Sequence, residues 1–204
     1  MSATRTLFDA RGMRDANIDD IARAVGINRT IIYRHVASKE ELFALTMVEY
    51  LKELQQFVDR ADDPAQDPRD RFDRMAESFT QFCTRYPAFL DCAFALMRKP
   101  GHDLLAEIGD AAALRLGRLM GMLLGRVSAV LRAGDEAGVF TVSDPDLVAT
   151  ALYTQILGTM HLARLGFYVR EAAPNVPEIV KVSDDQIRAL VLKAAISSVL
   201  TPVA

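Results

Sequence analysis

The stretch NIDDIARAVGINRTIIYRHVASKEELF, residues 17–43, decides the fold of the N-terminal part of the chain. Asn17 stands where a helix N-cap belongs, because its side-chain oxygen can accept a hydrogen bond from a free amide of the next turn. The apolar residues that follow share one helical face: Ile18, Ile21, Ala22 and Val25. Gly26 comes directly after this face and predicts the end of a short helix.

Two more helices are expected in the same stretch. Asn28 caps one over residues 29–36, and Ser38, with Glu41 three positions later, has the pattern of a capping box that opens a long helix to about Ala61. Two short helices joined by a tight turn that contains glycine are a helix-turn-helix candidate.

The second helix of such a motif turns polar and basic side chains to the major groove and apolar ones to its own domain. Ile32 and Val36, four residues apart, can face inward. The side chains left for DNA are Arg29, Thr30, Tyr33 and Arg34. Arginine pairs bidentately with guanine, whereas tyrosine, histidine and lysine serve phosphates. Lys39 is a further phosphate candidate, because the N-terminal end of a helix favours an anion.

The charge distribution supports a local DNA-binding face. The net charge of −3 argues on average against a nucleic-acid partner, but residues 21–39 contain no acid. The basic residues of that segment are Arg23, Arg29, Arg34 and Lys39. Acidic residues gather at positions 59–70 and 184–185 instead, so a basic face is compatible with an acidic molecule.

The run from Asp20 to Phe43 closely resembles the DNA-binding signature of TetR-type repressors, whose members typically read D-I-A, A-G-V-S, L-Y-x-H-F and S-K-E-x-L. The match covers about residues 8–45. The resemblance implies a homodimer of all-helical subunits with a variable ligand domain, in which the last two helices of each subunit form a four-helix interface. Ligand binding in such proteins respaces the DNA-binding heads and releases the operator.

By matched position the resemblance also implies roles for single residues. Those that look like phosphate contacts are Tyr33, His35, Lys39 and, at the usual cap position, Asn17. Those that look like base readers are Arg29, Thr30 and Arg34. The sequence departs from the signature at Thr30, Ile31 and Val36, and the family's usual upstream isoleucine and basic arm would lie before Met1. A small-molecule binding or interaction protein with weakened or lost DNA binding therefore stays open as an alternative.

The rest of the chain reads as further helices separated by breakers. Besides a first short helix over 2–11, we expect helices over about 68–86, 87–99, 111–137, 145–169 and 184–200, with Pro174 and Pro177 marking a loop. The expected fold is all-α, with about nine helices. Residues 1–45 form a three-helix helix-turn-helix DNA-binding domain, and residues 46–204 form a helical ligand-binding and dimerisation domain.

Several aromatic, sulfur-containing and polar side chains of the second domain could line a pocket for a small, largely apolar effector. The candidates are Phe79, Phe82, Phe94, Met97, Met122, Tyr153, Gln155 and His161. For any single one of them, ordinary core packing is the alternative.

The sequence gives little support for a membrane protein, a disulfide-stabilised protein or an enzyme. No run of apolar residues reaches membrane-spanning length, and Cys83 and Cys92 do not form a disulfide framework, which favours a cytoplasmic protein. Buried inert thiols are the main reading of the two cysteines, and a thiol sensor is the alternative. No nucleophile–base spacing, phosphate loop or metal cluster indicates an enzyme, so we expect no catalysis and no cofactor. The sequence thus predicts a ligand-responsive dimeric repressor of operator DNA.

Overall fold

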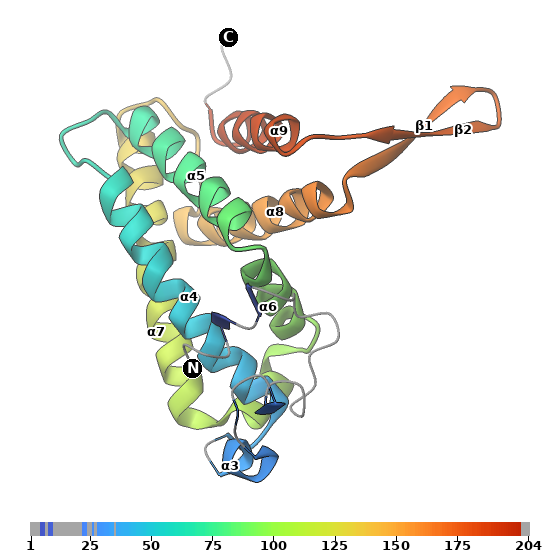
Figure 1. Ribbon diagram of the computed structural model, residues 1–204. Coiled ribbons are helices and arrows are strands. Elements are labelled where there is room, and N and C mark those ends of the chain that lie inside the picture. The colour runs from blue at the N-terminus through green and yellow to red at the C-terminus, as the bar shows by residue number, and fades with distance from the viewer. Residues whose placement is uncertain are drawn as a thin grey trace. The chain divides into compact units, whose positions relative to one another are not determined.

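The computed structural model in Figure 1 describes residues 5–6, 8–9, 22–23, 26, 28–34 and 36–200, with the backbone alone for Arg29 and Ile31. The chain divides into two compact units. Unit 1 consists of Met1–Gln56 and Tyr86–Met122, and unit 2 of Phe57–Arg85 and Leu123–Ala204. This division follows packing contacts, so the functional boundary expected near residue 45 stays a prediction.

Unit 1 contains α3 (Arg29–Tyr33), the first part of α4 (Lys39–Ala61), α6 (Pro87–Met97) and the first part of α7 (Gly101–Glu136). Its core is aromatic. The Phe8 and Phe43 rings meet edge to face with centroids 5.8 Å apart, and the Tyr50 and Phe89 rings do so at 6.0 Å. Phe8, Tyr50 and Phe89 are fully buried, so residues near the N-terminus share one core with α4 and α6.

Helix α7 contains, before the helix predicted from Ala111, a further helical segment that the sequence did not predict. The sequence led us to expect a helix from Ala111, but α7 begins at Gly101, where the N–H groups of Asp103 and Leu104 donate to the Pro100 carbonyl. The break that the sequence placed before residue 111 is a single residue, Gly109, with φ 70° and ψ 156°. This backbone conformation is open to glycine and strained for other residues.

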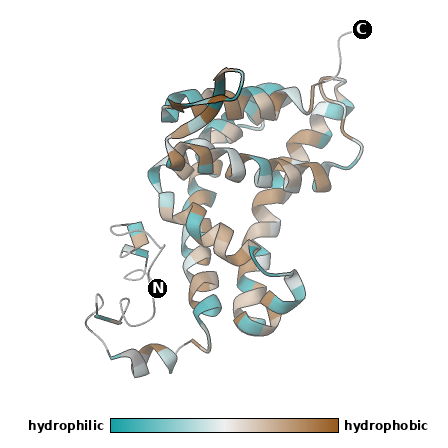
Figure 2. Ribbon diagram, turned by 90° about the vertical axis from the view of Figure 1, so that its right-hand side faces the viewer, coloured by the Kyte–Doolittle hydropathy of each residue, from teal (hydrophilic) through white to brown (hydrophobic). Residues whose placement is uncertain are grey.

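Unit 2 contains α5 (Pro68–Arg85), α8 (Pro145–Leu165) and α9 (Asp184–Ser197), which pack against one another. The predicted caps hold. Asp144 accepts hydrogen bonds from the N–H groups of Asp146 and Leu147, and Ser183 forms a full capping box with Gln186. Buried Phe72 and Phe140 pack edge to face, with ring centroids 5.7 Å apart. Polar and apolar residues alternate along the helices, as expected for helices that bury one face (Figure 2).

The segment between α8 and α9 corrects the sequence-based prediction. We expected α8 to reach Val169 and a loop to follow, but the helix ends at Leu165, and Gly166 is its left-handed C-cap (φ 72°). Strands β1 (Phe167–Ala173) and β2 (Val176–Lys181) then form an antiparallel hairpin, with Asn175 at φ 61° in the turn. Pro177 lies inside β2, on a strand with one free edge, where a proline is tolerated.

The all-α fold class is otherwise confirmed. Seven helices, α3 to α9, are bounded within the part of the chain that the structure describes, against the nine or so expected. The two other expected helices fall where most residues lie outside that part. None of the helices searched among the described residues is long and apolar enough to cross a membrane.

Candidate nucleic-acid interface and effector groove

Helix α3 carries the residues predicted to enter the major groove. Asn28, in extended conformation, caps it as expected, since its side-chain oxygen accepts a hydrogen bond from the Thr30 N–H at 2.9 Å. Before it, Gly26 donates its N–H to the Arg23 carbonyl at 3.2 Å and has φ 71°, which agrees with a helix ending at this glycine. A turn and a newly capped short helix thus follow each other as the sequence predicted.

The two faces of α3 differ as the motif requires. Ile32, on α3, and Val36, which follows the helix, are buried, at 7% and 3% exposure. Thr30, Tyr33 and Arg34 are exposed. The helix is therefore held by its apolar side, and its polar side is available to a partner.

The start of α4 adds a second group of polar residues. The Ser38 hydroxyl accepts from the Glu41 N–H at 2.9 Å and donates to the Glu107 carbonyl of α7 at 2.8 Å. The Glu41 carboxylate accepts from the Ala37 N–H at 2.6 Å, one residue before the position of a standard capping box. Lys39 is exposed, with its ammonium 5.2 Å from the centre of the Phe43 ring.

An ionic and aromatic cluster anchors the N-terminal residues to the rest of unit 1. The Arg5 guanidinium lies 4.7 Å from the ring centres of both Tyr50 and Tyr86, and 2.5 Å from a carboxylate oxygen of Glu53. The Tyr50 hydroxyl donates to Asp9 at 2.6 Å, and Tyr86 donates to Glu53. Burial, followed by the hydrogen bond to Asp9, raises the pKa of Tyr50, so this phenol stays protonated.

Another ionic cluster in unit 1 joins α4 to α7. The Lys99 ammonium lies 2.5 Å from the Glu107 carboxylate and 3.5 Å from that of Glu40. The hydrogen bond to Glu107 raises the pKa of Lys99. This lysine is therefore engaged by acids rather than offered to phosphate, unlike Lys39 on the neighbouring end of α4.

The structure describes only part of the predicted DNA-binding set. Thr30, Tyr33, Arg34 and Lys39 are placed and exposed. Arg29 begins α3, but its side chain is outside the described residues, as are the whole of Asn17 and His35. The assignment of these seven residues to bases or phosphates stays a prediction.

The predicted effector residues fall in both units. In unit 2, the rings of Phe79 and Tyr153 stack with centroids 5.8 Å apart, and fully buried Phe82 meets Phe57 edge to face at 5.3 Å. Burial raises the pKa of Tyr153. His161 is half-buried and Gln155 is exposed. In unit 1, Phe94 is half-buried, whereas Met97 and Met122 are 46% and 36% exposed.

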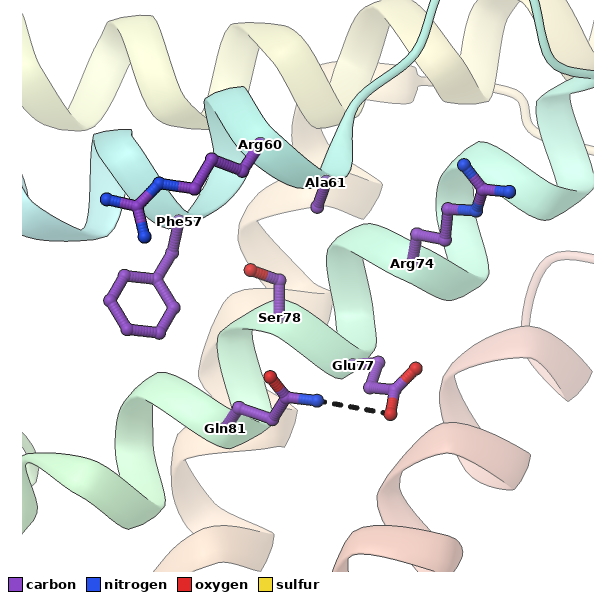
Figure 3. Close-up of a pocket in the computed structure, with 7 residues that line it drawn as sticks. All are labelled: Phe57, Arg60, Ala61, Arg74, Glu77, Ser78 and Gln81. Carbon is purple, nitrogen blue, oxygen red and sulfur yellow. Dashed lines mark hydrogen bonds between the residues drawn. The ribbon is translucent and has the colours of Figure 1, made fainter.

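A groove of about 350 Å³ lies between the end of α4 and one face of α5 in unit 2 (Figure 3). It is lined by Phe57, Arg60, Ala61, Arg74, Glu77, Ser78 and Gln81. Gln81 donates to Glu77 at 3.2 Å, and Ser78 is buried, at 8% exposure. None of the eight predicted effector residues lines this groove. It is also more polar than the cavity we expected.

The sequence contained a signal for this groove that our interpretation missed. Residues 74, 77, 78 and 81 follow the i, i+3, i+4, i+7 spacing of a single helical face. They form a polar stripe next to the apolar stripe of α5. In the described residues, no group of three or more histidine, cysteine, aspartate or glutamate side chains could hold a metal ion.

Comparison with known proteins finds a family model that matches the segment of the DNA-binding candidate. Residues 1–46 match the model of the bacterial regulatory proteins of the tetR family. The N-terminal segment of the chain is therefore similar to the tetR family. The matched range contains Asn28, the exposed side of α3 and the start of α4, so the family resemblance inferred from the signature is confirmed.

A curated transcriptional regulator is similar to a short part of the chain. The MftR regulator of Mycobacterium tuberculosis, named for mycofactocin biosynthesis, is 41% identical over 56 residues. The matched segment spans 28% of this chain and 28% of that relative.

Solved structures share the fold of nearly the whole chain. The ketosteroid transcriptional regulator KstR2 of M. tuberculosis is 19% identical, with a TM-score of 0.60 over 98% of this chain and 93% of its own. RolR in complex with resorcinol is 18% identical, with a TM-score of 0.65 over 97% and 84%. PfmR of Thermus thermophilus is 24% identical, with a TM-score of 0.57 over 94% and 95%. At these identities the likeness establishes the fold.

Proposed function

We propose that this chain is a regulator of the tetR family: a ligand-responsive DNA-binding transcriptional regulator, a repressor that a small, largely apolar molecule releases from its operator. The observation that carries the proposal is the capped helix α3, whose exposed Thr30, Tyr33 and Arg34 lie within the segment that matches the family model. No catalysis is part of the proposed function, and the cytoplasm is its proposed place.

In the proposed complex, α3 enters the major groove of double-stranded DNA. Arg29, Thr30 and Arg34 read base edges, and contacts to phosphates come from Asn17, Tyr33, His35 and Lys39. The burial of Ile32 and Val36 supports this orientation, because it fixes which side of the helix stays with the protein. Lys39 supports it as well, since it is exposed at the positive end of α4.

The regulator acts as a homodimer through its last two helices, α8 and α9. Both helices are buried on one side and exposed on the other. On α9, Ile187, Val191 and Ala195 are buried, whereas Leu190 is 51% exposed. A two-fold dimer presents two copies of α3 to half-sites one helical turn apart, so the operator is expected to be close to palindromic.

The proposed effector binds in the helical domain. Support comes from the stacked Phe79 and Tyr153 rings, since aromatic side chains that keep a polar group suit a small aromatic or alicyclic ligand. A structural neighbour, RolR, was solved with resorcinol. The groove at Phe57 and Arg60 offers a second, more polar place for the same ligand domain.

A fluorescence anisotropy titration tests the proposal. The DNA upstream of the chain's own gene is titrated at two salt concentrations, with a scrambled duplex as control. We expect sequence preference and a steep loss of affinity with salt. Arg29→Ala should relax the preference at one base pair, at a cost of about 1–3 kcal/mol. Binding with neither sequence preference nor salt dependence would favour the alternative of a ligand-binding protein without an operator.

A further inference from the structure

The hairpin between α8 and α9 has two chemically different faces. In its register Val169 lies opposite Ile179, and side chains two apart on a strand share a face. One face therefore carries the apolar side chains of Phe167, Val169, Pro177 and Ile179, with Glu171 and Lys181 beside them. The other carries Tyr168, Val180 and the Arg170–Glu178 ion pair, whose closest atoms are 2.7 Å apart.

The centre of the apolar face is the most exposed part of the hairpin. Val169 and Ile179 are 60% and 70% exposed and Phe167 is 42% exposed. On the other face Tyr168 is 41% exposed and Arg170 is exposed, whereas Glu178 and Val180 are half-buried. Figure 1 shows the hairpin running on beyond the adjoining ends of α8 and α9. An isolated two-stranded hairpin is marginally stable in water, and an exposed apolar sheet face is typical of an interaction surface. This face therefore needs a partner.

The exposed side of α8 indicates that the partner is a second copy of this chain. Its exposed residues include Leu147, Ala151, Thr154 and Gly158, which have the alternating four- and three-residue spacing of a helix–helix seam, and Leu165, seven residues further on. The seam has small residues at its centre and a leucine near each end. The Thr154 hydroxyl donates to the Thr150 carbonyl of its own helix, so burying this surface leaves that hydroxyl satisfied.

This seam is complementary to itself. Leu147 and Leu165 are 18 positions apart, which is five full turns, so they lie on the same side of α8 at an axial distance of about 27 Å. When two copies of α8 pack antiparallel about a two-fold axis near residue 156, position 147 of one copy lies beside position 165 of the other, and position 154 beside position 158. The hairpin starts two residues after Leu165, so it continues over the partner's end of α8.

We propose that the hairpin is a dimerisation arm, which packs its apolar face against a second copy of this chain beside Leu147 of that copy. The inference rests on the proposed homodimer. It adds the hairpin, which we had expected from the sequence to be a loop, to the dimer interface. Stable interfaces bury roughly 1,200–2,000 Å². A two-stranded arm supplies only part of that, so it strengthens a helix-based dimer rather than replacing it.

Cysteine cross-linking between two different variants tests the arm. Leu147→Cys and Val169→Cys are purified separately, mixed to allow subunit exchange, and treated with a short bis-maleimide. The two native cysteines are buried, at 1% and 0% exposure, and should stay silent. We expect a cross-linked band of twice the chain mass from the mixture and little from either variant alone. The matched control replaces Val169→Cys by Arg170→Cys, on the opposite face of the same strand.

A second variant measures what the arm contributes. Val169→Arg combined with Ile179→Glu places a new ion pair across the strands, beside the natural pair of Arg170 and Glu178, so the hairpin stays paired while its apolar face is lost. Sedimentation velocity should show the dimer dissociation constant raised about tenfold or more. The control is the swap Arg170→Glu with Glu178→Arg, which should leave that constant unchanged.

The possible failures are distinguishable. An unmodified chain that sediments as a monomer at high concentration would overturn the homodimer of the proposed function and the arm together. A dimer that gives no mixed cross-link, or that cross-links equally through Arg170→Cys, would overturn the arm alone. An unchanged dissociation constant in the Val169→Arg, Ile179→Glu variant would also overturn the arm.

Discussion

Removal of the Lys39 charge should lower the salt dependence of DNA binding by a calculable amount. Lys39 is exposed at the N-terminal end of α4, where we propose that it contacts a phosphate. Each phosphate contact contributes about 0.9 to the slope of log affinity against log salt, so two copies in a dimer contribute about 1.8. Over a rise from about 50 to 200 mM salt, the original protein should lose about twelvefold more affinity than Lys39→Ala.

Lys52 supplies the matched control. It lies on the same helix, and its ammonium is 2.7 Å from the carboxylate of Glu49. Lys52→Ala removes the same charge from the same unit, so it should leave the slope unchanged if the effect is a local contact. Anisotropy titrations at four or more salt concentrations give the slope. Equal slopes for Lys39→Ala and the original protein would refute the phosphate contact, and equal reductions for both variants would indicate long-range charge instead.

Three further predictions concern the fold. A methyl group on Gly134 would meet the ring of buried Phe140, so Gly134→Ala should cost about 1–3 kcal/mol in urea unfolding, whereas Gly125→Ala, in open space on the same helix, should gain about 0.5–1 kcal/mol. Hydrogen bonds from the N–H groups of Asp70 and Arg69 hold the pKa of Asp67 below its usual value. The contribution of the Asp67 carboxylate to the stability of the fold is therefore complete above about pH 4 and is lost as the pH falls through the lowered pKa. Asp67→Asn should flatten this part of the acid unfolding curve. Burial raises the pKa of Cys83 and of Cys92, so neither thiol should react with Ellman's reagent until the chain unfolds; fast reaction in the native state would revive the thiol-sensor alternative.

Helix starts could be predicted from the sequence because a cap is a local interaction. Asn28, Asp144 and Ser183 each accept hydrogen bonds from backbone N–H groups two or three residues away. Asparagine, aspartate and serine are the residue types preferred at this position, so the sequence alone predicts the role. The inward direction of Ile32 and Val36 was predictable for a similar reason, since helical spacing alone decides which side chains share a face.

The hairpin could not be predicted in the same way. Phe167, Tyr168 and Val169 are apolar or aromatic and follow directly on the apolar stripe of α8, so the periodicity extends the helix across Gly166. What ends the helix is the positive φ of that glycine, and what orders the next residues is pairing with a strand about ten positions later. Such pairing depends on the register of the two strands, which the local sequence pattern does not specify.

The candidate DNA interface was found because its residues lie within one short segment. The interactions that hold it in place were not found, because they join distant parts of the chain. The Ser38 hydroxyl bonds to the Glu107 carbonyl across 69 positions, and Arg5 lies close to the rings of Tyr50, on α4, and Tyr86, which precedes α6. The groove at the end of α4 depends likewise on two helices whose mutual packing no local pattern specifies.

The break in α7 has a consequence for how this sequence can change over time. Residues 117, 121 and 125 are glycines whose regular spacing suggests a constraint, yet each has open space where a side chain would begin and a φ that any residue adopts. Gly109 has the same open space but a φ of 70°. Among homologous sequences, the glycines at 117, 121 and 125 should therefore be replaced freely, whereas Gly109 should be kept. A homologue that lacks Gly109 should also have changed the hydrogen bond from Ser38 and the ion pair of Lys99 to Glu107, two residues away.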